Sequence, residues 1–176
     1  MSMKKPEIKK DFEIEFLIKG NQEDPTGNPL GYTRTTQASK WNPKYQRYSK
    51  WKNFVVAACM KQMPKIGGFN STIIDDEIDS GYVRIMSGAM QFKNYNLYPF
   101  IISKSTVIMD VRIKWANEKR PDPDNVFKGI ADSLFKDDKH VYGSVLPMDD
   151  AENLSGLVSV KIKIKTKQST KAAIGT

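Results

Sequence analysis

The sequence predicts a single α+β domain of the α/β type, in which two main helices pack on a mixed β-sheet. Three segments alternate apolar and polar residues with a period of two, as strands with one buried face do. Two further segments have helical spacing and begin with Asn or Asp followed by proline, a common helix start. The length of 176 residues suits one domain with a substantial core.

The strands are predicted at residues 12–18, 107–115 and 158–164. Every second residue in them is apolar, as Ile14, Phe16 and Ile18 illustrate, and most residues between are charged or polar. A further strand is expected to begin at Val141-Tyr142 and return beside the others. The alternation predicts a sheet with one buried face and one face in water.

The first helix is predicted from Asn42-Pro43 to Met63-Pro64, and the second from Asp122-Pro123 to about Lys136. The first should bury Tyr45, Tyr48, Val55 and Cys59. The second should bury Val126, Phe127, Ile130, Leu134 and Phe135. We assign the whole chain, residues 1–176, to one domain. Residues 64–105 are interpreted as an insertion that adds a hairpin or loop, and residues 167–176 as a frayed tail.

Composition excludes several classes of protein. Hydrophobic residues make up 39% and charged residues 27% of the chain, which is typical of a globular protein. No apolar run approaches the roughly 20 residues of a membrane span, and the basic N-terminus lacks the apolar stretch of a secretory signal. A single cysteine, Cys59, provides no internal disulfide and suits a reducing cytoplasm.

The net charge of +8 is unevenly distributed, since no Asp or Glu occurs between Pro25 and Ile74. Lysines and arginines in that window alternate with aromatic residues, including Tyr32, Trp41 and Trp51. Such a pattern suits a polyphosphate with stackable bases, although, taken alone, it is better explained by a solvated helix face with a few core aromatics. The cations expected to bind DNA are Arg34, Lys40, Lys44, Arg47, Lys50 and, near the second helix, Arg120.

The strongest chemical signal is a set of carboxylates around the second helix. Asp122 and Asp124 flank Pro123, and Lys128 follows one helical turn later. The pair Asp137-Asp138 follows the helix. Because Mg²⁺ prefers oxygen ligands and keeps several waters, two or three carboxylates suffice to bind it.

Each of these residues also has a purely structural interpretation. Asp122 or Asp124 could serve only as a helix N-cap, worth about 1 kcal/mol. Asp124 and Lys128 could form an exposed i,i+4 pair, and Asp137-Asp138 a solvated turn. The structural interpretation weakens when all the residues are considered together, because a cap requires one Asp and not two with a second pair downstream.

This segment resembles the RusA-type Holliday junction resolvases of bacteria and their phages. The matching motifs are Asp122-Pro123-Asp124-Asn125, Lys128, Asp132-Ser133-Leu134 and Asp137-Asp138. The resemblance covers most of the chain outside the insertion. It implies a cytoplasmic homodimer, bacterial or phage-encoded, that uses Mg²⁺, or Mn²⁺ in its place, to nick opposite strands of a four-way DNA junction.

The resemblance also implies roles for individual residues. Asp122, Asp124 and Asp138 would bind the catalytic metal, and Lys128 would be a catalytic cation near the scissile phosphate. Asn125, Asp132 and Asp137 would support the site. Asp149-Asp150 rivals Asp138 as the third ligand, because it too precedes a strand, although Lys139-His140-Val141 after Asp138 resembles the strand entry of the family.

The expected chemistry is metal-assisted hydrolysis of a phosphodiester that leaves 5′-phosphate and 3′-hydroxyl ends. His140, the one histidine, and Cys59 are not expected to act as base or nucleophile. The alternatives are a non-catalytic protein that binds branched DNA and a flap or single-strand endonuclease. An RNA-binding structural protein fits the pI of 9.4 but leaves the carboxylates unexplained.

Overall fold

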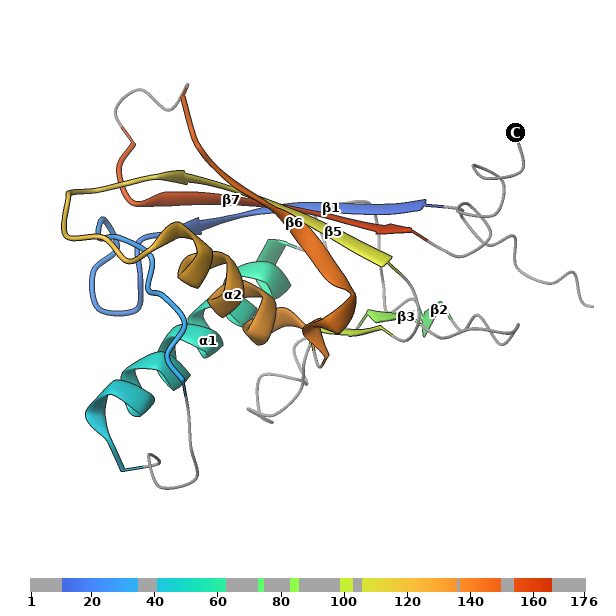
Figure 1. The fold of residues 1–176 in the computed structure, drawn as a ribbon, viewed down its shortest axis with the longest axis horizontal. Coiled ribbons are helices and arrows are strands. Elements are labelled where there is room, and N and C mark those ends of the chain that lie inside the picture. The colour runs from blue at the N-terminus through green and yellow to red at the C-terminus, as the bar shows by residue number, and fades with distance from the viewer. Residues whose placement is uncertain are drawn as a thin grey trace, which may run out of the picture.

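A mixed four-stranded sheet forms the centre of the protein (Figure 1). The computed structural model describes residues 11–34, 41–62, 73–74, 83–85, 99–102, 106–135, 137–149 and 154–165. The strands are β1 (Asp11–Lys19), β5 (Thr106–Lys114), β6 (Val141–Pro147) and β7 (Leu157–Lys165), in the spatial order β1-β7-β5-β6. β7 is antiparallel to both β1 and β5, whereas β6 is parallel to β5.

The period-two pattern determines which face of the sheet is buried, as predicted. Ile162 of β7 lies opposite both Ile14 of β1 and Met109 of β5, so these buried side chains form one row across three strands. The intervening residues face solvent, where Lys161 pairs with Glu13 at 3.0 Å. Trp115, predicted as the last strand residue, lies one position beyond β5 and is half-buried.

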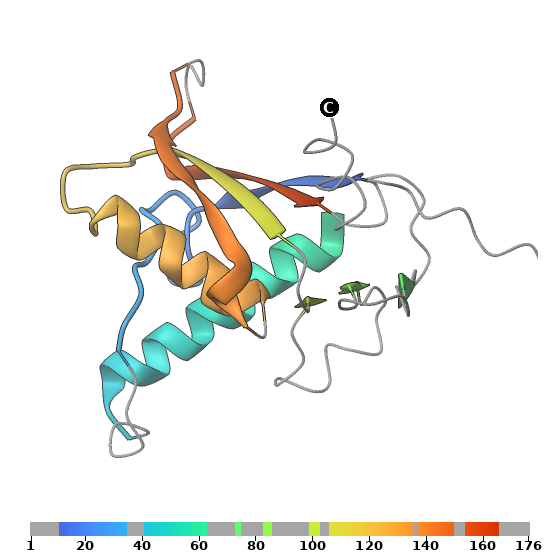
Figure 2. The ribbon, with the colours of Figure 1, turned by 45° about the vertical axis from the view of Figure 1, so that its right-hand side comes forward.

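Helices α1 (Pro43–Gln62) and α2 (Pro123–Leu134) cover the same face of the sheet, as both views of the ribbon show (Figures 1 and 2). Asn42 caps α1 by accepting a hydrogen bond from the Lys44 backbone N–H at 2.9 Å, as its sequence predicts. The core beneath the sheet comes from alternate strand residues and one face of each helix. This arrangement confirms the predicted α+β fold class.

The aromatic residues of the basic window separate into core and surface. Tyr48 and Trp51 are buried in α1, which confirms the core interpretation for these two side chains. Tyr45, predicted to be buried, is only half-buried, and Trp41 just before the helix is 88% exposed. In α2, Phe127 is likewise only half-buried, while Val126, Ile130 and Leu134 are buried as predicted.

The connection from β5 through α2 to β6 is the crossover that two adjacent parallel strands require. A 3₁₀ turn at Asp138–His140 links the helix to β6. The residues before and after α2 therefore lie at opposite ends of the parallel strands: Asp122 follows the carboxyl end of β5, and Asp138 precedes the amino end of β6.

Within the predicted insertion, β2 (Ile73–Ile74), β3 (Val83–Ile85) and β4 (Phe100–Ile102) form a small antiparallel sheet. The Phe100 ring stacks on that of Phe135 with their centroids 5.2 Å apart, which joins the small sheet to the end of α2. The predicted tail at 167–176 lies outside the described residues. In the described part of the chain, no helix has the length and apolar character needed to cross a membrane.

Candidate functional site

Asp122 and Asp124 lie together at the start of α2. Asp122 is the N-cap residue, and its Oδ1 accepts a hydrogen bond from the Asp124 backbone N–H at 2.9 Å. Both carboxylates are exposed to solvent. No hydrogen bond or ion pair within the described residues engages Asp122 Oδ2 or the Asp124 side chain. Asp122 therefore does serve as the helix cap. The cap bond uses only one of the four carboxylate oxygens of Asp122 and Asp124.

A cleft of about 670 Å³ lies beside this helix start. Its walls come from the loop at residues 21–33, the first half of α1 and the segment between β5 and α2. The side chains of interest that line it are Asp122, Asn125, Lys119, Lys44, Arg47 and Tyr32. Three of these are cations from two separate parts of the fold, and the lining also includes the carboxylates of Glu23 and Asp24, so the cleft combines three carboxylates with three groups that attract phosphate.

Buried asparagines hold the loop at residues 21–33 in place. Asn28 is 8% exposed, and its Oδ1 accepts a hydrogen bond from the Ala116 backbone N–H at 2.7 Å. Its Nδ2 donates to the backbone carbonyls of Asn117 and Lys119 and to Asn117 Oδ1, at 3.1 to 3.2 Å. Asn28 thus fastens this loop to the segment that leads into Asp122.

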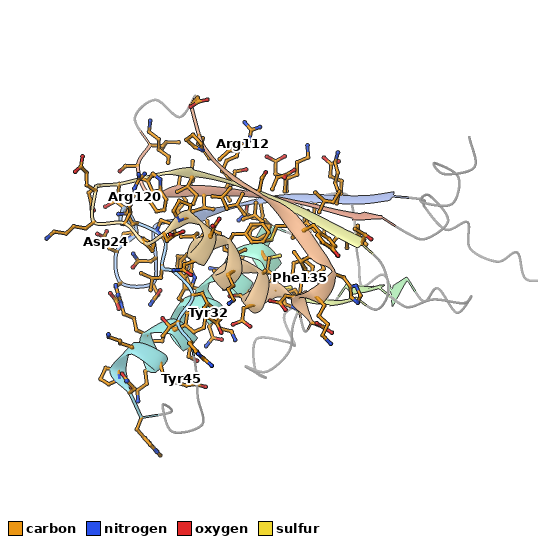
Figure 3. The ribbon with its side chains drawn as sticks, in the orientation of Figure 1. Asp24, Tyr32, Tyr45, Arg112, Arg120 and Phe135 are labelled. Carbon is orange, nitrogen blue, oxygen red and sulfur yellow. The ribbon has the colours of Figure 1, made fainter. Side chains whose placement is uncertain are left out.

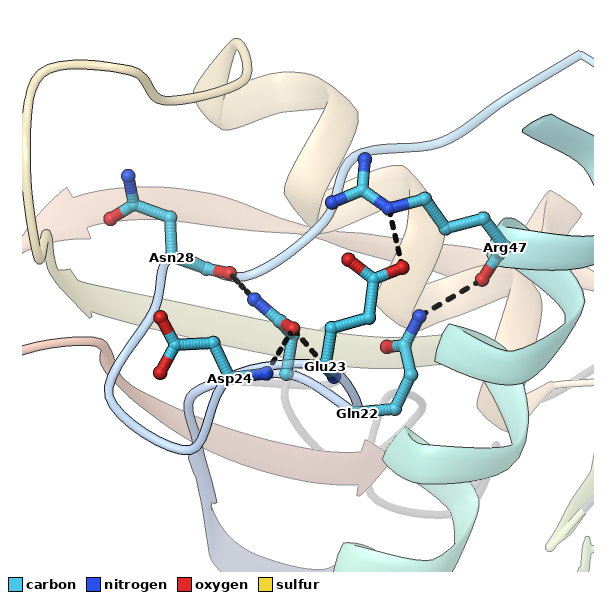
Figure 4. A network of polar contacts seen from close by, with 6 residues as sticks. Gln22, Glu23, Asp24, Asn28 and Arg47 are labelled. Carbon is cyan, nitrogen blue, oxygen red and sulfur yellow. Dashed lines mark hydrogen bonds and ion pairs between the residues drawn. The ribbon is translucent and has the colours of Figure 1, made fainter. Parts of the chain in front are cut away.

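Asn21 organises the other side of the same loop, where Figure 4 labels its partners Glu23, Asp24 and Asn28. Its Nδ2 donates to the Asn28 carbonyl at 2.7 Å, and its Oδ1 accepts from the backbone N–H groups of Glu23 and Asp24. Arg47 of α1 then pairs with Glu23 at 2.8 Å. The guanidinium predicted to bind DNA is therefore already paired with a carboxylate at the rim of the cleft.

Lys128 lies one helical turn after Asp124 and is exposed. Its Nζ lies 4.2 Å from the centroid of the Tyr32 ring, within the range of a cation–π contact. The Tyr32 backbone N–H donates to the Asn125 carbonyl at 2.8 Å, which ties the loop to the first turn of α2. Asn125 contributes through its backbone here, and its side chain is exposed.

Asp132 lies away from the start of α2 and joins the two helices. Its Oδ2 accepts a hydrogen bond from the Tyr48 hydroxyl at 2.6 Å and pairs with Lys52 Nζ at 3.2 Å. The structure therefore gives this predicted supporting residue a role in packing α1 against α2.

The pair Asp137-Asp138 lies beyond the opposite end of α2. A helix of 12 residues is about 18 Å long, so α2 separates Asp138 from Asp122 and Asp124. Asp137 caps the 3₁₀ turn by accepting from the Lys139 backbone N–H, and this bond lowers the pKa of the Asp137 carboxyl. Asp138 is exposed, and His140 is half-exposed at the end of the same turn.

Asp149, the first residue of the rival pair Asp149-Asp150, follows β6 at the carboxyl-terminal end of the two parallel strands, where β5 also ends. The Met148 backbone N–H donates to the Ile113 carbonyl at 3.0 Å, which fixes that register. Asp150 lies outside the described residues. Among the side chains that the structure describes, no three His, Cys, Asp or Glu residues are grouped to hold a metal ion. The assignment of a third ligand stays a prediction.

The predicted DNA-binding cations occupy three places. Lys44 and Arg47 line the cleft, whereas Lys50 and Arg34 are exposed outside its lining. The Arg120 guanidinium lies over the Trp115 ring at 5.0 Å. Lys40 lies outside the described residues.

Sequence patterns did not indicate Asn28, Glu23 or the position of Tyr32 beneath Lys128. No motif marks these residues, because they contact the site through loop geometry that the fold alone creates. Comparison of the chain with protein-family models, with curated proteins and with solved structures finds no match.

Proposed function

We propose that this protein is a Mg²⁺-dependent, structure-selective endodeoxyribonuclease that resolves four-way DNA junctions by paired hydrolysis of phosphodiester bonds. The observation that carries the proposal is the helix start at which Asp122 and Asp124 expose their carboxylates beside a cleft lined by Lys44, Arg47 and Lys119. A site for cutting DNA needs such a combination, with carboxylates for a metal ion and cations for the flanking phosphates.

The donor groups of the helix start fit Mg²⁺. Hard carboxylate oxygens are its preferred protein ligands, and the ion is commonly held by one or two carboxylates while it keeps several waters. Asp122 and Asp124 would hold it. When bound, Mg²⁺ supplies a Lewis acid that polarises the scissile phosphate and lowers the pKa of an attacking water. Mn²⁺, which also favours oxygen ligands, should substitute.

The chain's own residues orient and neutralise the substrate in this scheme. The Asp124 N–H holds Asp122 Oδ1 in the cap and so fixes the direction of that carboxylate. Lys128, on the same helix, would neutralise charge that develops on the phosphate in the transition state. The cations of the cleft would hold the phosphates to either side of the cut. The products are expected to be 5′-phosphate and 3′-hydroxyl ends.

The decisive experiment is cleavage of a labelled, synthetic four-way junction in Mg²⁺ by the wild type, Asp124→Asn and Glu118→Gln. Glu118 is an exposed carboxylate on the segment between β5 and α2, so its amide variant controls for the loss of one charge. Paired, symmetric nicks should be retained in Glu118→Gln and lost in Asp124→Asn, while both variants still bind the junction.

The third ligand can be tested in the same assay with Asp138→Asn, Asp149→Asn and Asp150→Asn. Loss of cleavage in Asp149→Asn or Asp150→Asn would assign the third ligand to the residues after β6, whereas loss in Asp138→Asn would show that a carboxylate at the far end of α2 is required. If all three variants cleave normally, Asp122 and Asp124 act without any of these residues.

The alternatives correspond to other outcomes of this experiment. Binding without nicks in Mg²⁺ and in Mn²⁺ would refute the enzyme and leave a non-catalytic protein that binds branched DNA. Faster cleavage of flap or single-stranded substrates in a side-by-side comparison would replace junction resolution with flap or single-strand cleavage. Metal-free binding should weaken steeply with salt, because phosphate contacts dominate such binding.

The proposal includes a homodimer that acts in the cytoplasm of a bacterial or phage-infected cell. Paired nicks in opposite strands require two active sites, which a dimer with twofold symmetry provides. Sedimentation of the free protein and of its junction complex measures the number of chains, and a single chain per junction would contradict this part.

A further inference from the structure

Lys128 has two carboxylates in the positions where a helical lysine usually finds an ion-pair partner. Asp124 precedes it by four residues and Asp132 follows it by four. Within the described residues, Lys128 forms an ion pair with neither of these carboxylates. Asp132 is instead engaged by the Tyr48 hydroxyl at 2.6 Å and by Lys52 at 3.2 Å. The ammonium of Lys128 lies over the ring of Tyr32, at 4.2 Å from its centroid.

Tyr32, labelled in Figure 3, contacts one helix through its backbone and the other through its ring. Its backbone N–H donates to the Asn125 carbonyl of α2 at 2.8 Å. Its ring meets the buried Tyr48 ring of α1 edge-to-face, with centroids 5.6 Å apart and planes at 80°. Because Tyr48 is in turn bonded to Asp132 of α2, the residue beneath Lys128 is fixed to α2 by its backbone and to α1 by its ring.

We propose that Tyr32 is a positioning residue that holds the Lys128 ammonium ready for the scissile phosphate, an inference that rests on the proposed nuclease function. A ring face attracts a cation weakly and leaves its charge intact. A carboxylate partner would neutralise the charge, and a phosphate would then have to displace it. The ring therefore restricts a side chain with four rotatable bonds while the charge stays available for the substrate.

The contacts of Asp132 with Tyr48 and Lys52 also help to keep the Lys128 ammonium available for the phosphate. Lys52 and the Tyr48 hydroxyl share Asp132 Oδ2, and Lys52 Nζ also lies 5.7 Å from the Tyr48 ring. With this carboxylate occupied, the i+4 partner of Lys128 does not compete with the phosphate. Asp124, the i−4 carboxylate, is reserved in the proposed function for the metal ion.

The first test measures the contact without any nuclease activity. Reductive ¹³C-methylation of the lysines gives one NMR signal for each lysine, and Lys128→Arg identifies that of Lys128 in the full-length protein. The ring current of Tyr32 should shift this signal upfield, and the shift should persist in Tyr32→Phe and disappear in Tyr32→Leu. An unshifted Lys128 signal in the otherwise wild-type protein would overturn the proposal, and that observation requires no Tyr32 variant to fold.

The second test measures positioning through catalysis. In single-turnover cleavage of a four-way junction, Tyr32→Leu should lower the rate about 2- to 5-fold, the equivalent of an exposed cation–π contact. Tyr32→Phe, which keeps the ring, should cleave at the wild-type rate, and junction binding should be equal in all three proteins. In a Lys128→Ala background, Tyr32→Leu should have no further effect, because the group it positions is gone.

The two tests separate this inference from the proposed function. An upfield-shifted Lys128 signal in a protein that cuts no DNA would refute the nuclease, and with it the positioning role, while the contact itself stands. A shifted signal together with wild-type cleavage by Tyr32→Leu would refute the positioning role alone. Equal losses from Tyr32→Leu in the presence and absence of Lys128 would assign Tyr32 to general folding of the loop and would also refute it.

Discussion

Replacing Asn28 by alanine should destabilise the protein, because this buried side chain joins the loop at residues 21–33 to the segment before α2. The substitution removes the bond accepted from the Ala116 N–H and the donations to Asn117 and Lys119. The two Nδ2 hydrogens are shared among three acceptors, so the side chain makes the equivalent of three full hydrogen bonds. At about 1 kcal/mol each, the expected loss is about 3 kcal/mol, or roughly 6–12 °C in Tm for a chain of this size.

Urea unfolding followed by circular dichroism measures this loss as a lower midpoint with an unchanged slope. Asn53→Ala is the matched control, since Asn53 is exposed on α1 and should change stability by no more than about 0.5 kcal/mol. If Asn28→Ala lies within about 1 kcal/mol of the wild type, or matches Asn53→Ala, the loop does not depend on these bonds and the reasoning is wrong.

Three further perturbations test other parts of the fold. Gly143→Ala should weaken the β5–β6 pairing by several kcal/mol in urea unfolding, since a Cβ there would overlap the Met109 backbone; a loss below about 1 kcal/mol would contradict that register. Lys161 lowers the pKa of Glu13, so the stability this pair provides should disappear as the pH falls through the lowered pKa, below the ordinary value of 4.5. Glu13→Gln should therefore reduce the drop in Tm across that acidic range, and an unchanged Tm–pH profile would exclude the pair as a contributor. Burial raises the pKa of the Cys59 thiol, so a thiol reagent at pH 8 should label it only after unfolding, and rapid labelling of the native protein would place it at the surface.

The elements of the main sheet could be predicted from the sequence because one residue pattern determines both the strand and its buried face. Ile14, Met109 and Ile162 occupy alternate positions in their strands and meet in one row of the core. The starts of the two helices could also be predicted, since Asn42 and Asp122 are cap residues and each is followed directly by proline. Local signals of this kind act over a few residues and need no knowledge of the fold.

The arrangement of the candidate site depends on contacts that local patterns do not encode. The Asp137-Asp138 motif lies close to Asp122 in sequence, yet α2 extends between them and carries Asp138 to its other end. Asn28 bonds to Ala116, which lies 88 residues further along the chain, and no periodic pattern in the sequence indicates this contact. The aromatic residues of the basic window looked alike in sequence, and only packing distinguishes the buried Trp51 from the exposed Trp41.

The end of α1 also affects how this sheet could associate with other strands. The Gln62 side chain donates from Nε2 to the Leu17 carbonyl at 2.7 Å and accepts from the Leu17 N–H at 2.9 Å, as a neighbouring strand would. An incoming strand that approached β1 at this position would find both backbone groups occupied. Growth of a fibril by edge-to-edge addition needs two receptive edges on every molecule. A single amide side chain thus protects this edge against aggregation at the point where β1 meets the helical layer.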